Sequence, residues 1–296
     1  MIPPAIDLHS GEGAEVPAQE GLPPPRSSVA NKLGWFGAVL ASVLAATAAF
    51  APLIAPYDPA ERVGRPFLPP SAEHPLGTND VGQDLLSELV FGARVSLTVG
   101  IVAALVAVVI GTAVGIVAGF YPRRLGSVLM RFVDVVLILP FLPLLIVLAA
   151  YLGRSLTNTI LVIGLLIWAA PARIIRSQVL SLRSREYVLA SRSIGASDRW
   201  VILRHILPRT ALLATGSFVR AVSGAILLEA ALSFLGLGDP IQKSWGSILF
   251  WAQSRGAFFT PAWKWWVLPP GLAIMAASLG FALIAFALEE RINPKL

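Results

Sequence analysis

The sequence predicts an all-α integral membrane protein with six transmembrane helices. Three observations lead to this prediction. The 296 residues are 56% hydrophobic and only 14% charged, and the mean hydropathy is +0.74. Soluble globular domains are nearer half apolar and a quarter charged. Apolar runs of membrane-spanning length recur along the chain, and a polar, arginine-rich segment separates two of them.

The apolar runs define the expected spans. A helix needs about 20 apolar residues to cross a hydrocarbon core of about 30 Å. Six runs meet this length, so both chain ends are expected on the same side of the membrane. The runs lie at about residues 34–54, 95–120, 128–152, 158–180, 209–236 and 263–288.

The chain before the first run has a different composition. Residues 1–32 are rich in Pro, Gly, Glu and Ser and show no apolar period, so we expect a disordered cytoplasmic tail. No basic region leads directly into an apolar core, which argues against a signal peptide. We then expect a first transmembrane helix with an external segment (33–94), and a core of five transmembrane helices (95–296). This core contains the arginine-rich loop (184–208).

Loop charge orients the spans. Between Pro171 and Arg209 the chain has eight arginines against two acids, whereas residues 55–93 have six acids and two arginines. Positively charged loops stay in the cytoplasm. We therefore expect residues 171–209 and both termini to be cytoplasmic and residues 55–93 to be external. Arginines grouped in this way suit topology-setting loops better than a nucleic-acid surface.

The arginine-rich loop has the pattern of two short helices. One helical stretch leads into Gly195 and a short polar turn, and a second runs from Arg199 to Leu207. We expect the second stretch to stop at Pro208, because proline lacks an N–H and disfavours a helical residue before it. Two short helices hinged by a glycine at the surface of an apolar bundle suit docking onto a soluble partner.

Five strings in order, with the arginine-rich loop, carry a resemblance to a known family. The strings are His74-Pro75-Leu76-Gly77-Thr78-Asn79-Asp80 with Gly82-Gln83-Asp84, Gly92-Ala93-Arg94-Val95-Ser96-Leu97, Met130-Arg131-Phe132-Val133-Asp134, Glu229-Ala230-Ala231-Leu232-Ser233-Phe234-Leu235-Gly236-Leu237-Gly238 and Ser244-Trp245-Gly246. From about Ser71 onward the chain resembles the permease subunits of bacterial ATP-binding-cassette (ABC) importers for dipeptides, oligopeptides and nickel. It is most similar to the second permease of a heterodimeric pair.

The resemblance implies an architecture and a set of partners. It implies the ABC type I importer permease fold in a multi-pass protein of the bacterial inner membrane, surrounded by lipid. It implies a homologous second permease, two ABC ATPase subunits and an extracytoplasmic substrate-binding protein. Peptides are the expected solute, and nickel chelates, opines or other small solutes are the alternatives.

The sequence also predicts that this chain has no nucleotide, cofactor or metal site of its own. It has no G-x-x-x-x-G-K-[ST] string, so it has no phosphate-binding loop of that type. We expect no cofactor in this chain and no enzymatic activity of its own, with ATP and Mg²⁺ bound by partner subunits. Without cysteine, and with three histidines in separate segments, no metal site is expected.

The arginine-rich loop resembles the family's cytoplasmic coupling loop, the EAA loop. The family places Glu-Ala-Ala before a glycine, whereas this chain has Leu189-Ala190-Ser191 and then Gly195, so Glu186 is the candidate substitute for the missing glutamate. The small side chains are expected to let a helix seat closely in a cleft of the ATPase. The expected coupling residues are Glu186, Ala190, Ser191, Gly195, Asp198, Arg199, His205, Leu207 and Pro208. The alternative is a basic loop that only sets topology.

Ionisable residues within the spans are candidates for the translocation path, because each costs free energy unless paired or hydrated. Asp134 follows Arg131 at i, i+3, and a structural ion pair between them is favoured over a solute contact. Glu229 is expected near the outer end of the fifth span, where it either lines the outer mouth or caps backbone groups.

Arg220 is the third such residue. It falls twelve residues after Pro208, about 18 Å along the fifth helix and near the membrane midplane. Our hypothesis is that it faces the translocation path and attracts a carboxylate of the solute. The alternative is an ion pair with Asp134 or with an acid of the partner chain.

Two other classes of membrane protein are less consistent with the sequence. An ion-coupled secondary transporter is expected to show an inverted repeat with broken spans at matching places, and none is evident. An intramembrane hydrolase needs a base near its nucleophile, yet no predicted span contains a histidine.

Overall fold

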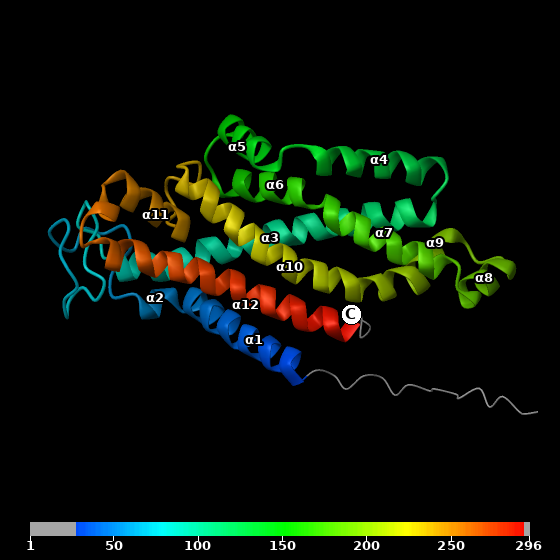
Figure 1. Cartoon of the computed structure of the whole chain (residues 1–296), viewed down its shortest axis with the longest axis horizontal. Helices are drawn as coiled ribbons and strands as arrows, with labels where there is room; N and C mark the ends of the chain where they lie inside the picture. The colour runs from blue at the N-terminus through cyan, green and yellow to red at the C-terminus, as the bar shows by residue number, and fades with distance from the viewer. Residues whose placement is uncertain (1–27, 293–296) are drawn as a thin grey trace, which may run out of the picture.

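The computed structural model describes residues 28–292 as a bundle of helices along one long axis, with no β-strand in that range (Figure 1). In chain order the helices are Ser28–Ala49 (α1), Ala51–Ile54 (α2), Leu85–Phe120 (α3), Arg124–Ile138 (α4), Phe141–Leu152 (α5), Leu156–Ile167 (α6), Ala169–Arg183 (α7), Glu186–Ser193 (α8), Asp198–Val201 (α9), Ile202–Ile206 (η1, a π-helix), Leu207–Phe234 (α10), Trp245–Ser254 (α11), Ala257–Phe259 (η2), Trp263–Val267 (η3, a π-helix) and Leu268–Ile292 (α12).

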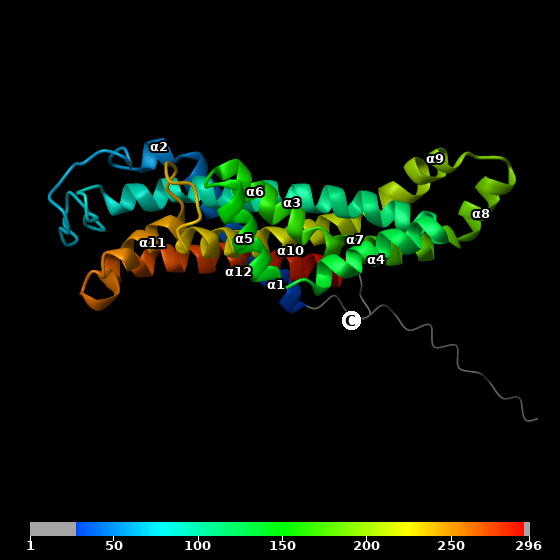
Figure 2. The same cartoon turned by 90° about the horizontal axis from the view of Figure 1, so that it is seen from above.

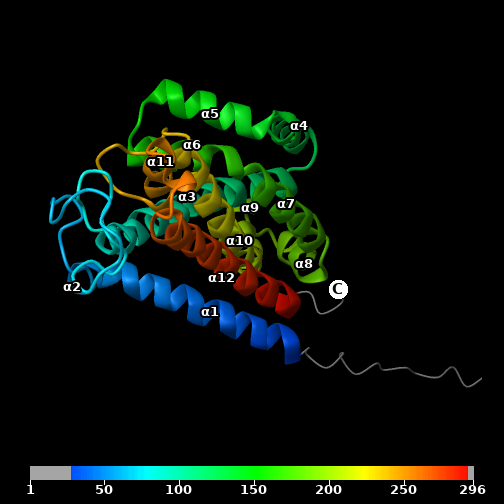
Figure 3. The ribbon, with the colours of Figure 1, turned by 60° about the vertical axis from the view of Figure 1, so that its left-hand side comes forward.

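Helix α3 is the central element. It packs against α7, α10, α6 and α1, while α12 lies between α1 and α10. Figure 3 shows α4 and α5 on the far side of the bundle from α1, and Figure 2 shows α8 and α9 at the opposite end from α11. The helices of the arginine-rich loop, α8 and α9, project from one end of the bundle, and residues 55–84 with α11 form the other end (Figure 1).

The expected membrane character is confirmed. Four helical segments are long and apolar enough to cross a membrane, and up to six if each of two bent pairs counts as one span. The first predicted boundary is shifted, because α1 already begins at Ser28. Residues 28–32 are therefore helical, and the rest of the predicted tail lies outside the described residues.

The second span begins earlier than predicted. Helix α3 starts at Leu85 rather than near residue 95, because the Asp84 carboxylate accepts a hydrogen bond from the Ser87 N–H and caps the first turn. Seven helical residues, 85–91, therefore precede Gly92 in the segment that was predicted to be an external loop. The first turn of α3 was not predicted because Ser87 and Glu88 are polar and interrupt the apolar run. Both residues are buried.

The third and fourth spans are bent. Helices α4 and α5 meet at 89° and α6 and α7 meet at 41°. Pro140 precedes α5, and Leu139 before it is extended at ψ 141°, which is the conformation that a following proline favours. Pro171 lies in the first turn of α7, just after the second bend at Trp168, where its missing N–H is tolerated.

Glycines at four-residue spacing allow α3 to approach α7 closely, as expected of small-xxx-small faces. A Cβ added to Gly115 would lie 2.7 Å from the Ala172 carbonyl oxygen and 2.8 Å from Ile175 Cβ. Added Cβ atoms on Gly111 and Gly119 would lie 2.8 Å from Pro171 Cβ and 2.6 Å from Val179 Cβ of α7. Hydrogen is therefore the only side chain that fits at these positions without moving α7.

We predict that Gly115→Ala lowers the free energy of unfolding by about 1–3 kcal/mol, because the methyl group has no space. The matched control is Gly224→Ala in α10, where a Cβ meets nothing within 4 Å and a helical alanine stabilises by up to about 1 kcal/mol. Tryptophan fluorescence during thermal unfolding in detergent measures both. Equal unfolding temperatures for the two variants would contradict the close packing of α3 on α7.

Candidate functional site

The arginine-rich loop begins with α8, whose two ends are well defined. Arg185 before it is extended at ψ 143°. At its C-terminal end the Gly195 N–H donates to the Arg192 carbonyl and the Ala196 N–H donates to the Ser191 carbonyl. Gly195 is in the left-handed region at φ +90°, which completes a Schellman motif. The predicted glycine hinge is thus a fixed helix stop.

The second helix of the loop does not stop at Pro208, so that prediction is wrong. Ser197 caps α9 by accepting from the Trp200 N–H. The chain then stays helical from Asp198 to Phe234, through α9, η1 and α10. In the π-turn the Leu207 N–H donates to the Ile202 carbonyl, five residues back. This wider turn directly precedes the proline, which lies in the first turn of α10 and so interrupts no α-helical ladder.

Apolar contacts hold the loop against the ends of α3 and α7. One buried cluster joins these helices to α8, α9 and η1; its members are Ile116, Phe120, Ile175, Val179, Leu182, Val188, Val201 and Ile206. Arg192 adds a polar tie. Its guanidinium lies 4.6 Å from the centre of the Phe120 ring and donates to the Asp198 carboxylate at 2.8 Å. The loop is therefore packed onto the ends of α3 and α7.

Three predicted coupling residues are bonded within the loop. The Ser191 hydroxyl donates to the Tyr187 carbonyl at 2.7 Å and lies 3.2 Å from His205 Nε2. Because serine has one proton to give, His205 donates in the second bond. The imidazole ring also contacts Trp200, at 5.0 Å between ring centres. Ser191, His205 and the Arg192-bound Asp198 thus shape the loop from within, and Ser191 does not present a small surface to a partner.

The other predicted residues are exposed, and the sequence reading missed apolar neighbours beside them. Glu186, Ala190, Gly195, Arg199, Leu207 and Pro208 are exposed. So are four apolar side chains of the loop, Leu189, Ile194, Trp200 and Leu203, and Ile194 has 88% of its surface exposed. The sequence could have indicated these four residues, because they are large apolar residues within a polar loop. Large apolar side chains exposed together mark an interaction surface.

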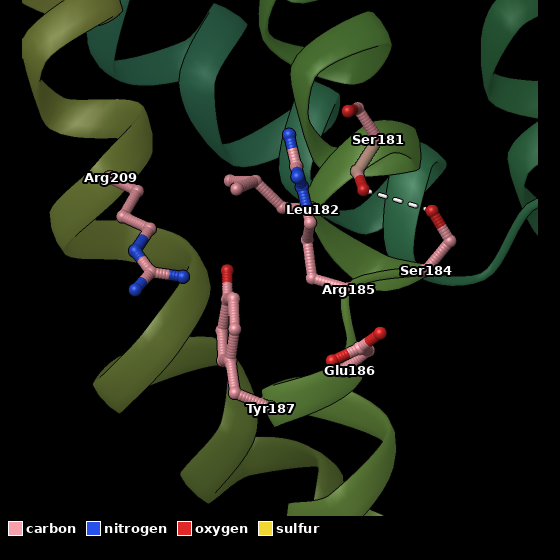
Figure 4. Close-up of a pocket in the computed structure, with 7 residues that line it drawn as sticks. All are labelled: Ser181, Leu182, Ser184, Arg185, Glu186, Tyr187 and Arg209. Carbon is pink, nitrogen blue, oxygen red and sulfur yellow. Dashed lines mark hydrogen bonds between the residues drawn. The ribbon is translucent and has the colours of Figure 1, made fainter. Parts of the chain in front are cut away.

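A cleft of about 830 Å³ opens where α7, α8 and α10 meet (Figure 4). Ser181, Leu182, Ser184, Arg185, Glu186, Tyr187 and Arg209 line it. The Arg209 guanidinium lies 3.9 Å from the centre of the Tyr187 ring, within the range of a cation–π contact. The tyrosine thereby holds one cation at the side of the cleft.

Comparison with known proteins identifies the family. Residues 111–296 match the family described as binding-protein-dependent transport system inner membrane component. Residues 28–70 match the N-terminal TM domain of oligopeptide transport permease C. The chain belongs to the family of binding-protein-dependent transport permeases.

Relatives of known name agree with this membership. Di/tripeptide transport system permease protein DppC of Pseudomonas aeruginosa is 38% identical over 279 residues. The match covers 91% of this chain and 90% of the length of that relative. Dipeptide transport system permease protein DppC of Alkalihalophilus pseudofirmus is 36% identical over 90% of this chain and 87% of its own. A putative peptide transport system permease protein of Brucella suis is 40% identical over 88% of this chain and 87% of its own. The resemblance to peptide importer permeases is confirmed.

Asp134 of this permease is paired, but with a different arginine from the one predicted. Its carboxylate accepts from Arg173 of α7 at 2.6 Å. The expected i, i+3 pair with Arg131 is not formed. The bundle brings α4 alongside α7, and a partner on the facing helix replaces the one on the same helix.

Arg220 also forms an ion pair within the chain, with Glu289. An ion pair was the expected alternative to a position on the translocation path. The partner, however, is neither Asp134 nor an acid of another chain. Glu289 lies in the last turn of α12, so Arg220 is level with the loop-side end of that helix. The predicted midplane depth assumed that the membrane begins at Pro208, whereas α10 extends beyond the end of α12.

Glu229 is buried, with 2% of its surface exposed, and does not line an outer mouth. Its carboxylate accepts from the hydroxyls of Ser96 at 2.8 Å and Ser233 at 2.7 Å. Ser96 Oγ in turn accepts from the N–H of Trp245 at the start of α11. Glu229 therefore joins α3, α10 and α11 through Ser96, and its own carboxylate bonds hydroxyl groups rather than backbone groups.

Two ion pairs connect the segments at the opposite end of the bundle. Lys243 Nζ lies 2.8 Å from the carboxylate of Glu88, which is 2% exposed. Asn79 also donates to this carboxylate at 2.8 Å. Arg255 pairs with Asp80 at 2.7 Å. Segments 55–84 and 237–262 are thereby joined into one surface.

Within the first of these segments Asp84 is a buried hub. Its carboxylate lies 3.0 Å from His74 Nδ1 and accepts from both the N–H and the hydroxyl of Ser87. Asp84 thus fastens the segment to the first turn of α3. The His74 and Asp84 positions of the family string act here as structural ties.

We predict that Lys243→Met destabilises the permease by roughly 3 kcal/mol, because the Glu88 carboxylate stays buried without its cation. The double variant Glu88→Gln/Lys243→Met should recover most of the loss, since no buried charge remains. Lys264→Met, at an exposed lysine of η3, is the control. Thermal unfolding in detergent measures all three, and an unchanged Lys243→Met would contradict a buried ion pair.

Proposed function

We propose that this chain is a pore-forming subunit of an ATP-driven peptide importer, and that α8 and α9 dock onto ATPase subunits. One observation carries the proposal: the loop is continuous with α10 through η1 and is packed onto α3 and α7. A force applied to α8 and α9 therefore moves three long elements of the bundle together. A loop that only set topology would not need this packing.

The proposed complex contains four kinds of subunit. A homologous second permease completes the pore, two ABC ATPases bind ATP and Mg²⁺, and an extracytoplasmic binding protein delivers the solute. Closure of the ATPases on ATP would bring the two coupling loops together and rock the permeases from inward-facing to outward-facing. This chain would carry the motion and make no covalent change to the solute.

The proposed topology follows from charge. The coupling loop and both termini would be cytoplasmic in a bacterial inner membrane, because the arginines concentrate there. The joined surface of segments 55–84 and 237–262 would then face outward and receive the binding protein. Ion pairs that hold this surface in one shape support the proposal, since a rigid surface loses less entropy on docking.

We propose peptides as the solute, because relatives of 36–40% identity are named as peptide or dipeptide permeases. The measurement is uptake of labelled di- and tripeptides in cells that lack the gene, with and without the wild-type copy. We expect uptake to return only with the gene. Return of nickel-chelate or opine uptake, with no peptide uptake, would overturn the peptide assignment.

We predict that Gly195→Arg abolishes co-purification of the ATPase with a tagged permease. The new side chain points into open space, since a Cβ at Gly195 meets nothing within 4 Å. The backbone cost of a left-handed residue is about 1 kcal/mol, so the variant should still insert and pair. The large, charged arginine side chain would lie on the proposed docking face and block the ATPase.

Gly256→Arg is the matched control, because Gly256 also has a positive φ of +72° and open space around it, at the other end of the bundle. It should retain the ATPase. Absence of any ATPase with the wild type in mild detergent would contradict the importer assignment. Retention by Gly195→Arg would contradict docking at α8.

A further inference from the structure

The cleft beside α8 contains hydrogen-bond donors without acceptors. The Tyr187 hydroxyl oxygen is buried and has no hydrogen-bond partner in the chain. Arg185 and Arg209 line the same cleft, and neither forms an ion pair with a carboxylate of residues 28–292. Figure 4 shows the Tyr187 hydroxyl between the two guanidinium groups.

The charge of the cleft favours an anion. Two arginines and Glu186 give its lining a net charge of +1, as two positive charges less one negative. An unsatisfied buried hydroxyl costs about 1–3 kcal/mol. A carboxylate is a suitable ligand, because it accepts from several donors at once and binds guanidinium groups in bidentate fashion.

The place of the cleft favours a protein ligand over a lipid headgroup. Arg185, Glu186 and Tyr187 stand at the start of α8, the first helix of the loop proposed to dock onto the ATPase. A lipid phosphate would offer the same acceptor oxygens, and the phospholipid measurement distinguishes the two sources.

We propose that this cleft receives a carboxylate side chain of the ATPase subunit, bound by Arg185, Arg209 and the Tyr187 hydroxyl. The inference rests on the proposed docking of α8 and α9. It adds the polarity of the contact: the permease supplies the cations and the ATPase supplies the acid.

The first experiment compares two double variants of the tagged permease in its native host. Arg185→Gln/Arg209→Gln removes the cations of the cleft. Arg123→Gln/Arg124→Gln removes the same charge from exposed positions at the start of α4, at the same end of the bundle. The ATPase retained on the tag is measured across a range of NaCl concentrations.

We expect the cleft variant to retain ATPase about tenfold less well or worse at low salt, because a desolvated charge pair has lost one partner. We expect the remaining binding to depend less on salt. The control should behave as the wild type. Tyr187→Phe keeps the ring under Arg209 and should weaken retention by about fivefold, the value of one hydrogen bond.

A cross-link tests the contact directly. Arg209→Lys places a primary amine in the cleft, and a water-soluble carbodiimide joins an amine to an adjacent carboxylate with loss of water. We expect a covalent product of permease and ATPase from Arg209→Lys and none from Arg124→Lys. Mass spectrometry of the product identifies the acid.

The outcomes separate this inference from the proposed function. If the wild type retains no ATPase, the proposed function fails first. If the wild type and the cleft variant retain it equally, ATPase docking stands and the carboxylate contact is overturned. If only co-purified phospholipid phosphorus falls in the cleft variant, the ligand is a lipid phosphate, and the proposal is overturned in that direction.

Discussion

The close approach of α3 to α7 is the contact on which the rest of the permease depends. Gly111, Gly115 and Gly119 bring the two helices within reach of backbone atoms along the loop-side half of α3. With no hydrophobic driving force between helices in lipid, such fitted surfaces supply the attraction through dispersion forces. The end of α7 is thereby held beside the end of α3, and the apolar cluster that seats α8 and α9 forms across both.

The same arrangement explains how the loop can transmit force. A helix ended by Gly195 and a second helix joined to α10 leave little freedom inside the loop. The π-turn of η1 keeps the chain helical up to Pro208, where an ordinary helix would be interrupted. The elements that would meet an ATPase are therefore extensions of the long helices, and a movement at the loop displaces the bundle end as one unit.

Polar groups within the bundle act mainly as ties between elements. Glu229 joins α3, α10 and α11 through serine hydroxyls, Asp134 pairs with Arg173 of the facing helix, and Glu88 holds Lys243. Each tie connects residues far apart in the sequence. This is why reading along one helix assigned Asp134 to Arg131, and why Arg220 was placed without Glu289. Helical spacing predicts neighbours on the same helix and says nothing about the helix opposite.

The sequence by itself determined the class of the protein, the apolar spans and the family, because these depend on composition and on local patterns. It also located the arginine-rich loop between two of the spans. Only the tertiary structure decided that Ser191 and His205 are bonded within the loop, that Pro208 breaks no helix, and that Arg185, Tyr187 and Arg209 share one cleft. Those features depend on which elements lie opposite one another, and long-range packing sets that arrangement.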